Sequence, residues 1–327
     1  MKILWPICGM LLAASGSLPA QQGRLSGPVA GFVFDNSGGV MRPIQGVPGA
    51  SLLGDPLSFG IDLAAAYIAP RQDSAIVVGA DQSLHLFLLN GGAPTEVSLG
   101  GVTGTPERVV FSPSGTAVAL ISAGSARVLT GLPNAPALTG SVRVEGNAAA
   151  GATGPRSHSI SAPSLALSDD GTYVLTIAQG TARLLSVQGQ NRMLVPAQVS
   201  AQVAFAPGGH DAAVVDSLTG LTLIRDASGA AGTQLLAAPD EGLAGPVGVA
   251  FSQDKQTLYV ASATAQSVAA FNLAGASRTA IGCACTPTTL APMGNLFRLT
   301  ELTTGPLWVL DGTAATPRTV FVPARVE

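Results

Sequence analysis

A pattern of short apolar segments around a tight turn recurs along this chain and limits its fold more than any other feature. In 107–131, 165–187 and 203–226, an apolar run is followed by a turn and then by two further apolar runs. The turns of six such units lie at residues 70–73, 113–115, 169–171, 207–209, 253–255 and 292–294. Successive turns are 43, 56, 38, 46 and 39 residues apart. Most of them contain Pro or Gly, the residues that tight turns favour.

Each unit reads as an apolar strand, a turn, two more strands and a weaker fourth strand. Four strands in a period of roughly 40 to 50 residues are typical of one blade of a β-propeller. A single blade cannot bury both of its faces, so neighbouring blades must stack against each other. No segment keeps a helical period over three turns, and we therefore predict an all-β propeller.

The number of blades follows from the two ends of the chain. Residues 31–46 contain only the last hairpin of a unit and resemble residues 305–324 at the other end. Residues 31–326 hold roughly seven units at the mean spacing. We predict seven four-stranded blades, the first assembled from the N-terminal hairpin and neighbouring terminal segments, with the ring closed by pairing of the N- and C-terminal segments. Six blades with a separate hairpin are the alternative.

The N-terminus has the outline of a secretory signal peptide. Lys2 precedes an apolar stretch, Ile3–Ala14. A segment of mostly small residues follows and ends at Ala20, a plausible cleavage point. We expect residues 1–20 to be a signal peptide and 21–327 to be a single propeller domain, secreted or periplasmic. An apolar N-terminal strand is the alternative. Cys8 lacks the small-residue context of a lipoprotein signal, so no lipid anchor is expected, and no run is long enough for a transmembrane helix.

Composition narrows the classes of partner. Apolar residues make up 47% of the chain, charged residues 11%, and the net charge is −3. Lys occurs only at Lys2 and Lys255, so no basic field exists to attract nucleic acid or an anionic membrane.

The long spacing of 56 residues comes from 145–163, which is rich in Gly, Ala and Ser and reads as a flexible loop between blades.

Two motifs resemble known propeller repeats. The sequences VVFSPSG (109–115) and VAFAPGG (203–209) resemble the repeats of bacterial propellers of the TolB-like and WD-repeat-like type. The segment QTLYVASATAQSVAAFNLAG (256–275) resembles the YVTN family of secreted propellers. The resemblance implies the fold and export, and little about substrate. No unit has the Trp-Asp ending of a true WD repeat or the tryptophan-docking ending of quinoprotein dehydrogenases, so no quinone is expected, and we predict no cofactor.

No catalytic motif is recognisable. Nucleophile elbow, phosphate-binding loop, zinc-protease and EF-hand patterns are all missing. His85 alternates with leucines and reads as a sheet residue, whereas His210 lies in a turn and is expected to be exposed. Arg156 and His158, both in the long loop, are the candidate anion-binding residues, and a solvated loop is the alternative.

Polar residues near the starts of the innermost strands form a second group of candidates. These are Asp62, Arg108 and Gln202, and we take Arg108 as a candidate binding residue of the central channel. Acidic turns such as 35–38 and 169–171 resemble fragments of calcium loops. Calcium needs six or more converging oxygens, so local side-chain-to-backbone hydrogen bonds are the preferred explanation, and no metal site is predicted.

Cys283 and Cys285 are the only cysteines after residue 20. In an exported protein an even number of cysteines favours a disulfide. Residues i and i+2 of a strand are near the upper distance limit for this bond, and Gly282 before the pair and Pro287 after it allow the necessary bend. Free thiols and a redox or metal-binding pair are the alternatives.

Three functions fit these observations. The first, which we favour, is an exported monomeric scaffold that binds a protein, peptide or glycan and has no catalytic site. The second is a lactonase-like propeller hydrolase, which rests on fold analogy alone. The third is a structural component of the cell envelope.

Overall fold

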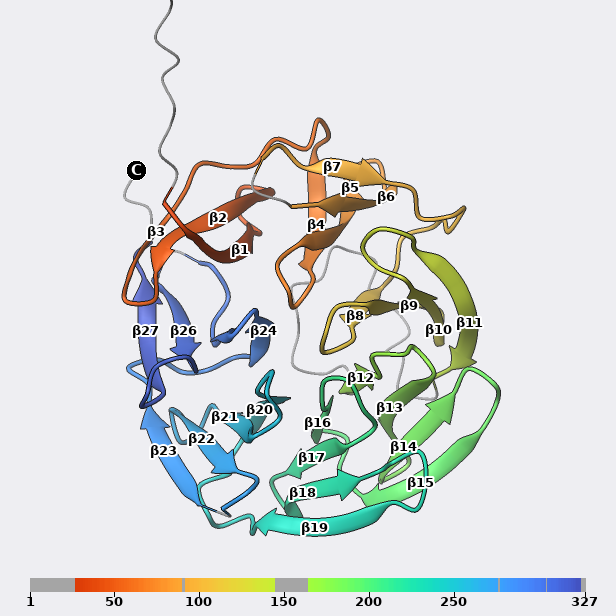
Figure 1. The fold of residues 1–327 in the computed structure, drawn as a ribbon, viewed down its shortest axis with the longest axis vertical. Helices are drawn as coiled ribbons and strands as arrows, with labels where there is room; N and C mark the ends of the chain where they lie inside the picture. The colour runs from red at the N-terminus through yellow and green to blue at the C-terminus, as the bar shows by residue number, and fades with distance from the viewer. Residues whose placement is uncertain (1–26, 90–91, 145–163, 276, 304, 325–327) are drawn as a thin grey trace, which may run out of the picture.

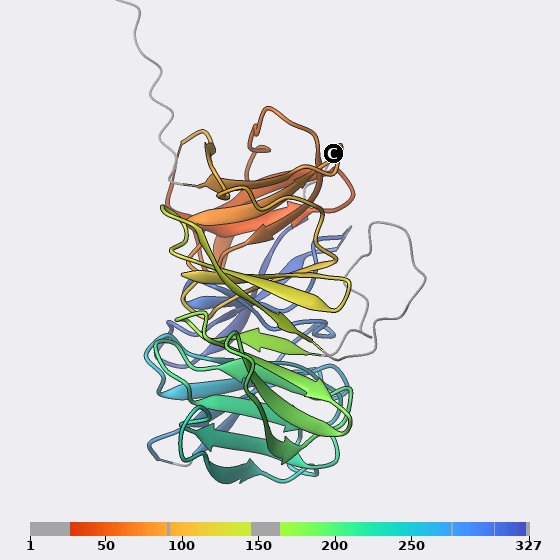
Figure 2. The same cartoon turned by 90° about the vertical axis from the view of Figure 1, so that its right-hand side faces the viewer.

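Seven antiparallel sheets form a closed ring in a computed structural model of the chain. Figure 1 shows the ring along its axis, and Figure 2 shows it edge-on as a disc. The structure describes residues 27–89, 92–144, 164–275, 277–303 and 305–324. Within these residues all regular structure is β-strand, and no helix that could span a membrane is found. The predicted seven-bladed β-propeller is confirmed, and among the described residues blade 1 has three strands where four were predicted.

The blades follow one another along the chain without exchange of strands. Blade 1 contains β1 (Val29–Asp35), β2 (Val40–Val47) and β3 (Ala50–Leu53). Blade 2 contains β4 (Leu63–Ile68), β5 (Ser74–Gly79), β6 (Leu84–Leu88) and β7 (Thr95–Val97). Blade 3 contains β8 (Arg108–Phe111), β9 (Ala117–Ser122), β10 (Ser125–Thr130) and β11 (Ala137–Arg143). Blade 4 contains β12 (Leu165–Leu167), β13 (Tyr173–Ala178), β14 (Thr181–Ser186) and β15 (Asn191–Pro196).

The remaining three blades repeat this order. Blade 5 contains β16 (Gln202–Phe205), β17 (Ala212–Asp216), β18 (Gly220–Arg225) and β19 (Gly232–Ala237). Blade 6 contains β20 (Pro246–Phe251), β21 (Thr257–Ser262), β22 (Ser267–Asn272) and β23 (Arg278–Gly282). Blade 7 contains β24 (Ala291–Met293), β25 (Leu296–Arg298), β26 (Leu307–Asp311) and β27 (Arg318–Val322). In every blade the first strand lies nearest the axis and the last lies at the rim (Figure 1).

The core is divided into seven apolar clusters, one at each junction between neighbouring blades. The second strand of a blade contributes to two clusters because its alternate side chains face opposite neighbours. In β17, for example, Ala212 and Val214 pack towards blade 4, and Ala213 and Val215 pack towards blade 6. These strands are buried on both faces, which is why they read in the sequence as continuous apolar runs.

Closure of the ring differs from the prediction. We expected the N- and C-terminal segments to pair as strands of one sheet. Instead, all strands of blade 1 come from residues 29–53, and β27 pairs only with β26 among the described residues. The ends meet through side chains, because Val33 and Ile44 of blade 1 pack against Met293 and Val322 of blade 7. Face-to-face packing of complete sheets removes the need for a shared sheet.

Hydrogen bonds from the turn of blade 2 strengthen this closure. Phe32 N–H in β1 donates to Oε1 of Gln72 at 2.7 Å. The N–H of Gly294, in the hairpin between β24 and β25, donates to the carbonyl of Pro70 at 2.6 Å. The turn of blade 2 therefore contacts both blade 1 and blade 7, so the first blade is held from two sides.

The acidic turns contain the local hydrogen bonds that the sequence predicts. Asp35 Oδ1 accepts from the backbone N–H groups of Ser37 and Gly38, and Asp170 Oδ1 accepts from the N–H of Thr172 at 2.9 Å. These carboxylates complete turns that would otherwise leave donors unpaired. Two other predictions, the signal peptide at 1–20 and the flexible loop at 145–163, lie outside the described residues.

Candidate functional site

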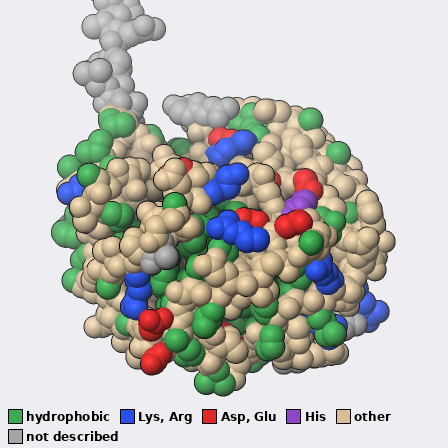
Figure 3. All heavy atoms as spheres, turned by 60° about the horizontal axis from the view of Figure 1, so that its bottom comes forward, with side chains coloured by type: hydrophobic (Ala, Val, Ile, Leu, Met, Phe, Trp, Pro, Cys, Tyr) green, Lys and Arg blue, Asp and Glu red, His purple; other side chains and the backbone are tan. Residues whose placement is uncertain are grey.

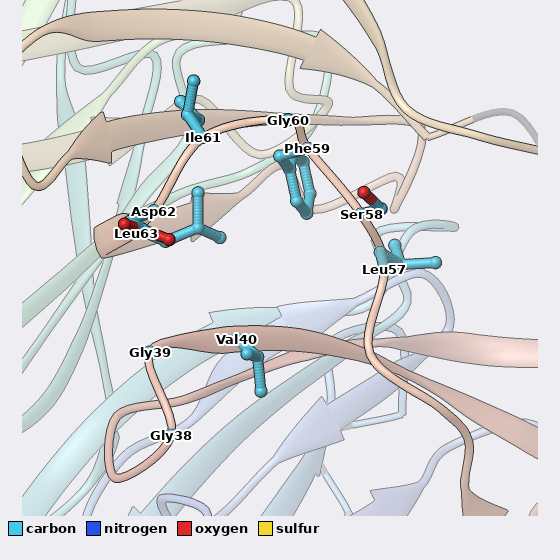
Figure 4. Close-up of a pocket in the computed structure, with 10 residues that line it drawn as sticks. All are labelled: Gly38, Gly39, Val40, Leu57, Ser58, Phe59, Gly60, Ile61, Asp62 and Leu63. Atoms are coloured by element: carbon cyan, nitrogen blue, oxygen red, sulfur yellow. The ribbon is translucent and has the colours of Figure 1, made fainter.

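A cleft of 610 Å³ opens between blades 1 and 2. Its walls come from the turn between β1 and β2 and from the linker that leads from β3 at the rim to β4 near the axis. Figure 4 shows the linker on one side of the cleft and β2 on the other. The described residues that line the cleft are Gly38, Gly39, Val40, Leu57, Ser58, Phe59, Gly60, Ile61, Asp62 and Leu63.

The backbone of the linker is hydrogen-bonded near its two ends. At the start, the N–H of Gly54 donates to the carbonyl of Pro43, and the N–H of Leu57 donates to that of Met41, both at 2.8 Å. At the other end, the carbonyl of Asp62 accepts from Ala80 N–H at 2.9 Å. The chain between Leu57 and Asp62 belongs to no strand, so it passes over the junction without closing it.

The lining of the cleft is mixed: exposed glycines and Ser58 lie beside apolar side chains and a single charge. Phe59 is buried and packs edge-to-face on Phe87 of β6, with 4.9 Å between ring centroids, which fixes the base of the linker. Ile61 is 37% exposed, and Leu57 is partly exposed. Asp62 is exposed and is the sole ionisable side chain among the described residues of the lining. A lining of apolar side chains, exposed backbone and a single carboxylate suits a ligand that has both apolar and polar groups and a positive charge.

Arg108 and Tyr67 form a second polar feature on the innermost strands. Arg108 begins β8 and Tyr67 lies in β4, so the two come from adjacent blades. Burial lowers the pKa of Arg108, and the neighbouring Tyr67 opposes this shift. Burial raises the pKa of Tyr67 above its usual 10.0, and the charge of Arg108 partly offsets the rise.

The other candidates from the sequence do not join this pair in one site. Asp62 lies in the cleft between blades 1 and 2. Gln202 begins β16 in blade 5, and its Nε2 donates to the carbonyl of Ser200 at 3.0 Å. Arg156 and His158 lie outside the described residues. The predicted group of channel residues is therefore spread over different parts of the ring.

His85 belongs to a network that the sequence analysis missed. Its Nε2 lies 2.6 Å from Oγ of Ser83, and its Nδ1 lies 2.7 Å from Oε1 of Glu96. The order of groups matches that of an acid–His–Ser triad. However, the Ser83 hydroxyl donates to Asp81, so its proton is not available to His85. The Asp81 carboxylate beside Oγ would also oppose the negative charge that develops during nucleophilic attack. We therefore interpret the network as one that stabilises the turn and not as a catalytic triad.

His210 lies in a turn, as expected, but is only partly exposed. Its Nδ1 is 2.8 Å from Oγ of Ser228, its Nε2 is 3.1 Å from Asp170, and its ring packs edge-to-face on Tyr173. Burial raises the pKa of Asp170, but hydrogen bonds from Ser168, Thr172 and His210 outweigh it, so this pKa is lowered. Asp170 and His210 are 40 residues apart in the sequence, so no local sequence pattern predicts their contact.

Cys283 and Cys285 are joined by a disulfide, with an S–S distance of 1.89 Å and a Cα–Cα distance of 5.0 Å. The bond lies in the connection from β23 of blade 6 to β24 of blade 7. Cys283 is buried in the cluster between these two blades, and Cys285 packs against it. The disulfide thus anchors the connection between blades 6 and 7.

Among the described residues, no three His, Cys, Asp or Glu side chains are grouped so that they could hold a metal ion.

Comparisons with known proteins agree with this architecture. One similar structure is a functionally unknown protein from Desulfotomaculum acetoxidans, with a TM-score of 0.55, 13% identity, and coverage of 90% of this chain and 100% of that one. Another is virginiamycin B lyase from Staphylococcus aureus, with a TM-score of 0.50, 13% identity, and coverage of 80% and 84%. At such low identity the likeness shows the fold alone. No protein-family model and no curated protein matches the chain.

Proposed function

We propose that this chain is an exported β-propeller that serves as a binding scaffold and receives a peptide segment of a partner protein in the cleft between blades 1 and 2. The observation that carries the proposal is the cleft itself. It has a volume of 610 Å³, falls in the range of known binding sites, and is bounded by a linker whose residues 57–62 belong to no strand.

The lining determines which kind of peptide fits. Leu57 and Ile61 give the linker wall an apolar surface that is partly open to solvent. Asp62 lies beside them and supplies the one charge among the described lining residues. The irregular linker also offers backbone groups outside any sheet. An apolar segment with one Lys or Arg would satisfy both the surface and the carboxylate.

Export is part of this proposal. It is supported by the sequence of residues 1–20 and by the Cys283–Cys285 disulfide, because disulfides persist in oxidising compartments.

The surface fits a neutral partner better than a strongly charged one. Figure 3 shows basic and acidic side chains interspersed on one face, with apolar groups between them and no broad field of one sign.

Selection of random peptides displayed on phage against the immobilised chain from residue 21 tests the proposal. We expect apolar peptides with a basic residue to be enriched. They should lose at least about tenfold in affinity for Ile61→Asp, which places a charge on the apolar wall, and for Asp62→Lys, which reverses the local charge.

Leu218→Asp is the matched control, because Leu218 is 65% exposed in the turn between β17 and β18, far from the cleft in sequence and outside its lining. The peptides should bind this variant as tightly as the unaltered chain. If they bind Ile61→Asp and Asp62→Lys equally well, or if no peptide is enriched, the proposed site is wrong.

A further inference from the structure

A second, smaller hollow lies two blades further round the ring, between blades 3 and 4. It has a volume of 190 Å³. One wall is the end of β11, and the other is the face of β13 and β14 together with the turn that leads to β15. The described residues that line it are Val142, Arg143, Thr176, Ala178, Arg183, Leu185, Gly189, Gln190 and Asn191. We refer to this hollow as the blade 3–4 groove.

Two polar atoms in the lining of the groove are buried without a partner. Thr176 is 1% exposed, and its Oγ1 has no hydrogen bond; the same holds for the buried Nε of Arg183. The two residues are directly opposite each other on β13 and β14, so their side chains share a face of the sheet. Buried polar atoms in folded proteins nearly always have a partner, and a pair of orphaned donors in a hollow indicates an absent acceptor.

The charge of the groove is also uncompensated. Arg183 Nη2 donates to the neutral side chain of Gln179 at 2.7 Å, and neither Arg183 nor Arg143 forms an ion pair within the described residues. Five other arginines do pair with Asp or Glu: Arg42, Arg71, Arg225, Arg298 and Arg318. Two guanidinium groups at one hollow, with no carboxylate among its described lining residues, favour an anionic ligand.

Apart from Gly189, Gln190 and Asn191, the rest of the described wall is apolar. Val142, Ala178 and Leu185 are all buried and line the same groove. A cavity of about 150 Å³ with apolar walls is large enough for a benzene molecule. The groove is somewhat larger, so it has room for an apolar body of this size in addition to a polar group at the arginines.

We propose that the blade 3–4 groove binds a small carboxylate with an apolar body of about the size of benzoate. The carboxylate accepts from Nε of Arg183 and Oγ1 of Thr176, and Arg143 adds positive charge. The apolar body packs on Val142 and Leu185. This site is separate from the cleft between blades 1 and 2, and its test does not depend on the peptide-binding proposal.

Titration calorimetry of the chain from residue 21 with benzoate tests the site. We expect saturable binding at one site per chain. Thr176→Val keeps the shape of the side chain but removes the hydroxyl, and Arg183→Gln removes the charge. Each variant should weaken benzoate binding by at least about tenfold, the loss expected when a charged hydrogen bond is removed. Benzyl alcohol, which has the ring but no charge, should bind far more weakly than benzoate.

Arg127→Gln is the matched control, because Arg127 lies on β10 of blade 3, donates to the carbonyl of Thr103 and does not line the groove. Its benzoate affinity should equal that of the unaltered chain. Thr176→Val also removes a buried hydroxyl without a partner, so it should fold even if Arg183→Gln does not. The proposal is overturned if benzoate does not bind at about 10 mM, if both site variants keep full affinity, or if phosphate binds as tightly as benzoate.

Discussion

Asp169 connects the turns of three consecutive blades. Its Oδ1 accepts from the backbone N–H of Ser114 at 2.7 Å and from the Ser114 hydroxyl at 2.6 Å, both in blade 3. Its Oδ2 accepts from the N–H of Gly208 in blade 5 at 2.6 Å. Because a carboxylate forms stronger hydrogen bonds than a neutral acceptor, one side chain stabilises the relative position of blades 3, 4 and 5.

We expect Asp169→Ala to lower the free energy of unfolding by about 2 kcal/mol, since two backbone donors and a hydroxyl lose their acceptor. Urea unfolding followed by circular dichroism measures the change. Asp240→Ala is the control, because Asp240 is exposed and forms none of these bonds, and it should change stability by less than about 0.5 kcal/mol. Equal effects of the two substitutions would show that the bridge does not stabilise the ring.

The pKa of Asp254 gives stability a definite dependence on pH. A hydrogen bond from the Ser252 hydroxyl, and then one from the Gln256 backbone N–H, lower this pKa below the usual 3.8. A lowered pKa in the folded state contributes stability above pH 3.8, and the contribution is lost as the pH falls through the folded-state pKa. Asp35 and Asp170 also have lowered pKa values and add to the effect in the same direction.

The free energy of unfolding should therefore fall as the pH is lowered from about 5 to about 2. In Ser252→Ala the fall should be smaller, because the pKa of Asp254 returns towards its unfolded value. Denaturant titrations at a series of pH values measure the two slopes. The same slope in both proteins would contradict the role assigned to the Ser252 hydroxyl.

The strands of a blade differ in burial according to their distance from the rim. β17 and most of β18 are buried, whereas four of the six residues of β19 are exposed. The outer strands present large apolar side chains to solvent, among them Leu138, Met193, Leu235 and Phe321. A fourth strand lies at the rim and leaves many of its residues exposed, and this explains why it reads as the weakest strand of each unit.

Leu223 and Leu235 test this difference within blade 5. Leu223 of β18 is fully buried, and Leu235 of β19 is 60% exposed. We expect Leu223→Ala to cost about 3 kcal/mol through lost burial and a residual cavity. Leu235→Ala should cost less than about 0.5 kcal/mol. Thermal and urea unfolding of both variants measure the costs, and a similar cost for the two would contradict the burial pattern.

The whole ring depends on the junction between blades 7 and 1, where the two ends of the chain meet. No strand is shared there among the described residues, so the junction is stabilised by packing and by the hydrogen bonds from the side chain of Gln72 and the carbonyl of Pro70 in the turn of blade 2. Met293 is 3% exposed in this cluster, and its Sδ lies where a Cβ on Gly31 would clash at 2.6 Å. Gly31 thus permits the close approach of the two blades.

Met293→Ala should lower the free energy of unfolding by about 2 to 4 kcal/mol, because it leaves a cavity at the closing junction. Met193→Ala is a matched control, because Met193 is 67% exposed on β15 and makes no comparable contact. Calorimetric unfolding measures both. A loss no larger for Met293→Ala than for Met193→Ala would show that this junction does not limit the stability of the ring.

Local patterns determined the repeat, the seven blades and the acidic turns, because strand period, turn chemistry and Asp–backbone hydrogen bonds act over a few residues. The position of Arg108 at the start of an innermost strand was also predictable from the repeat. Tertiary structure alone decided how the ring closes, where the cleft beside Asp62 opens, and that Thr176 and Arg183 face a groove beside blade 3. These features depend on contacts between blades, and the sequence distance between contacting residues there is too large for any local pattern to show them.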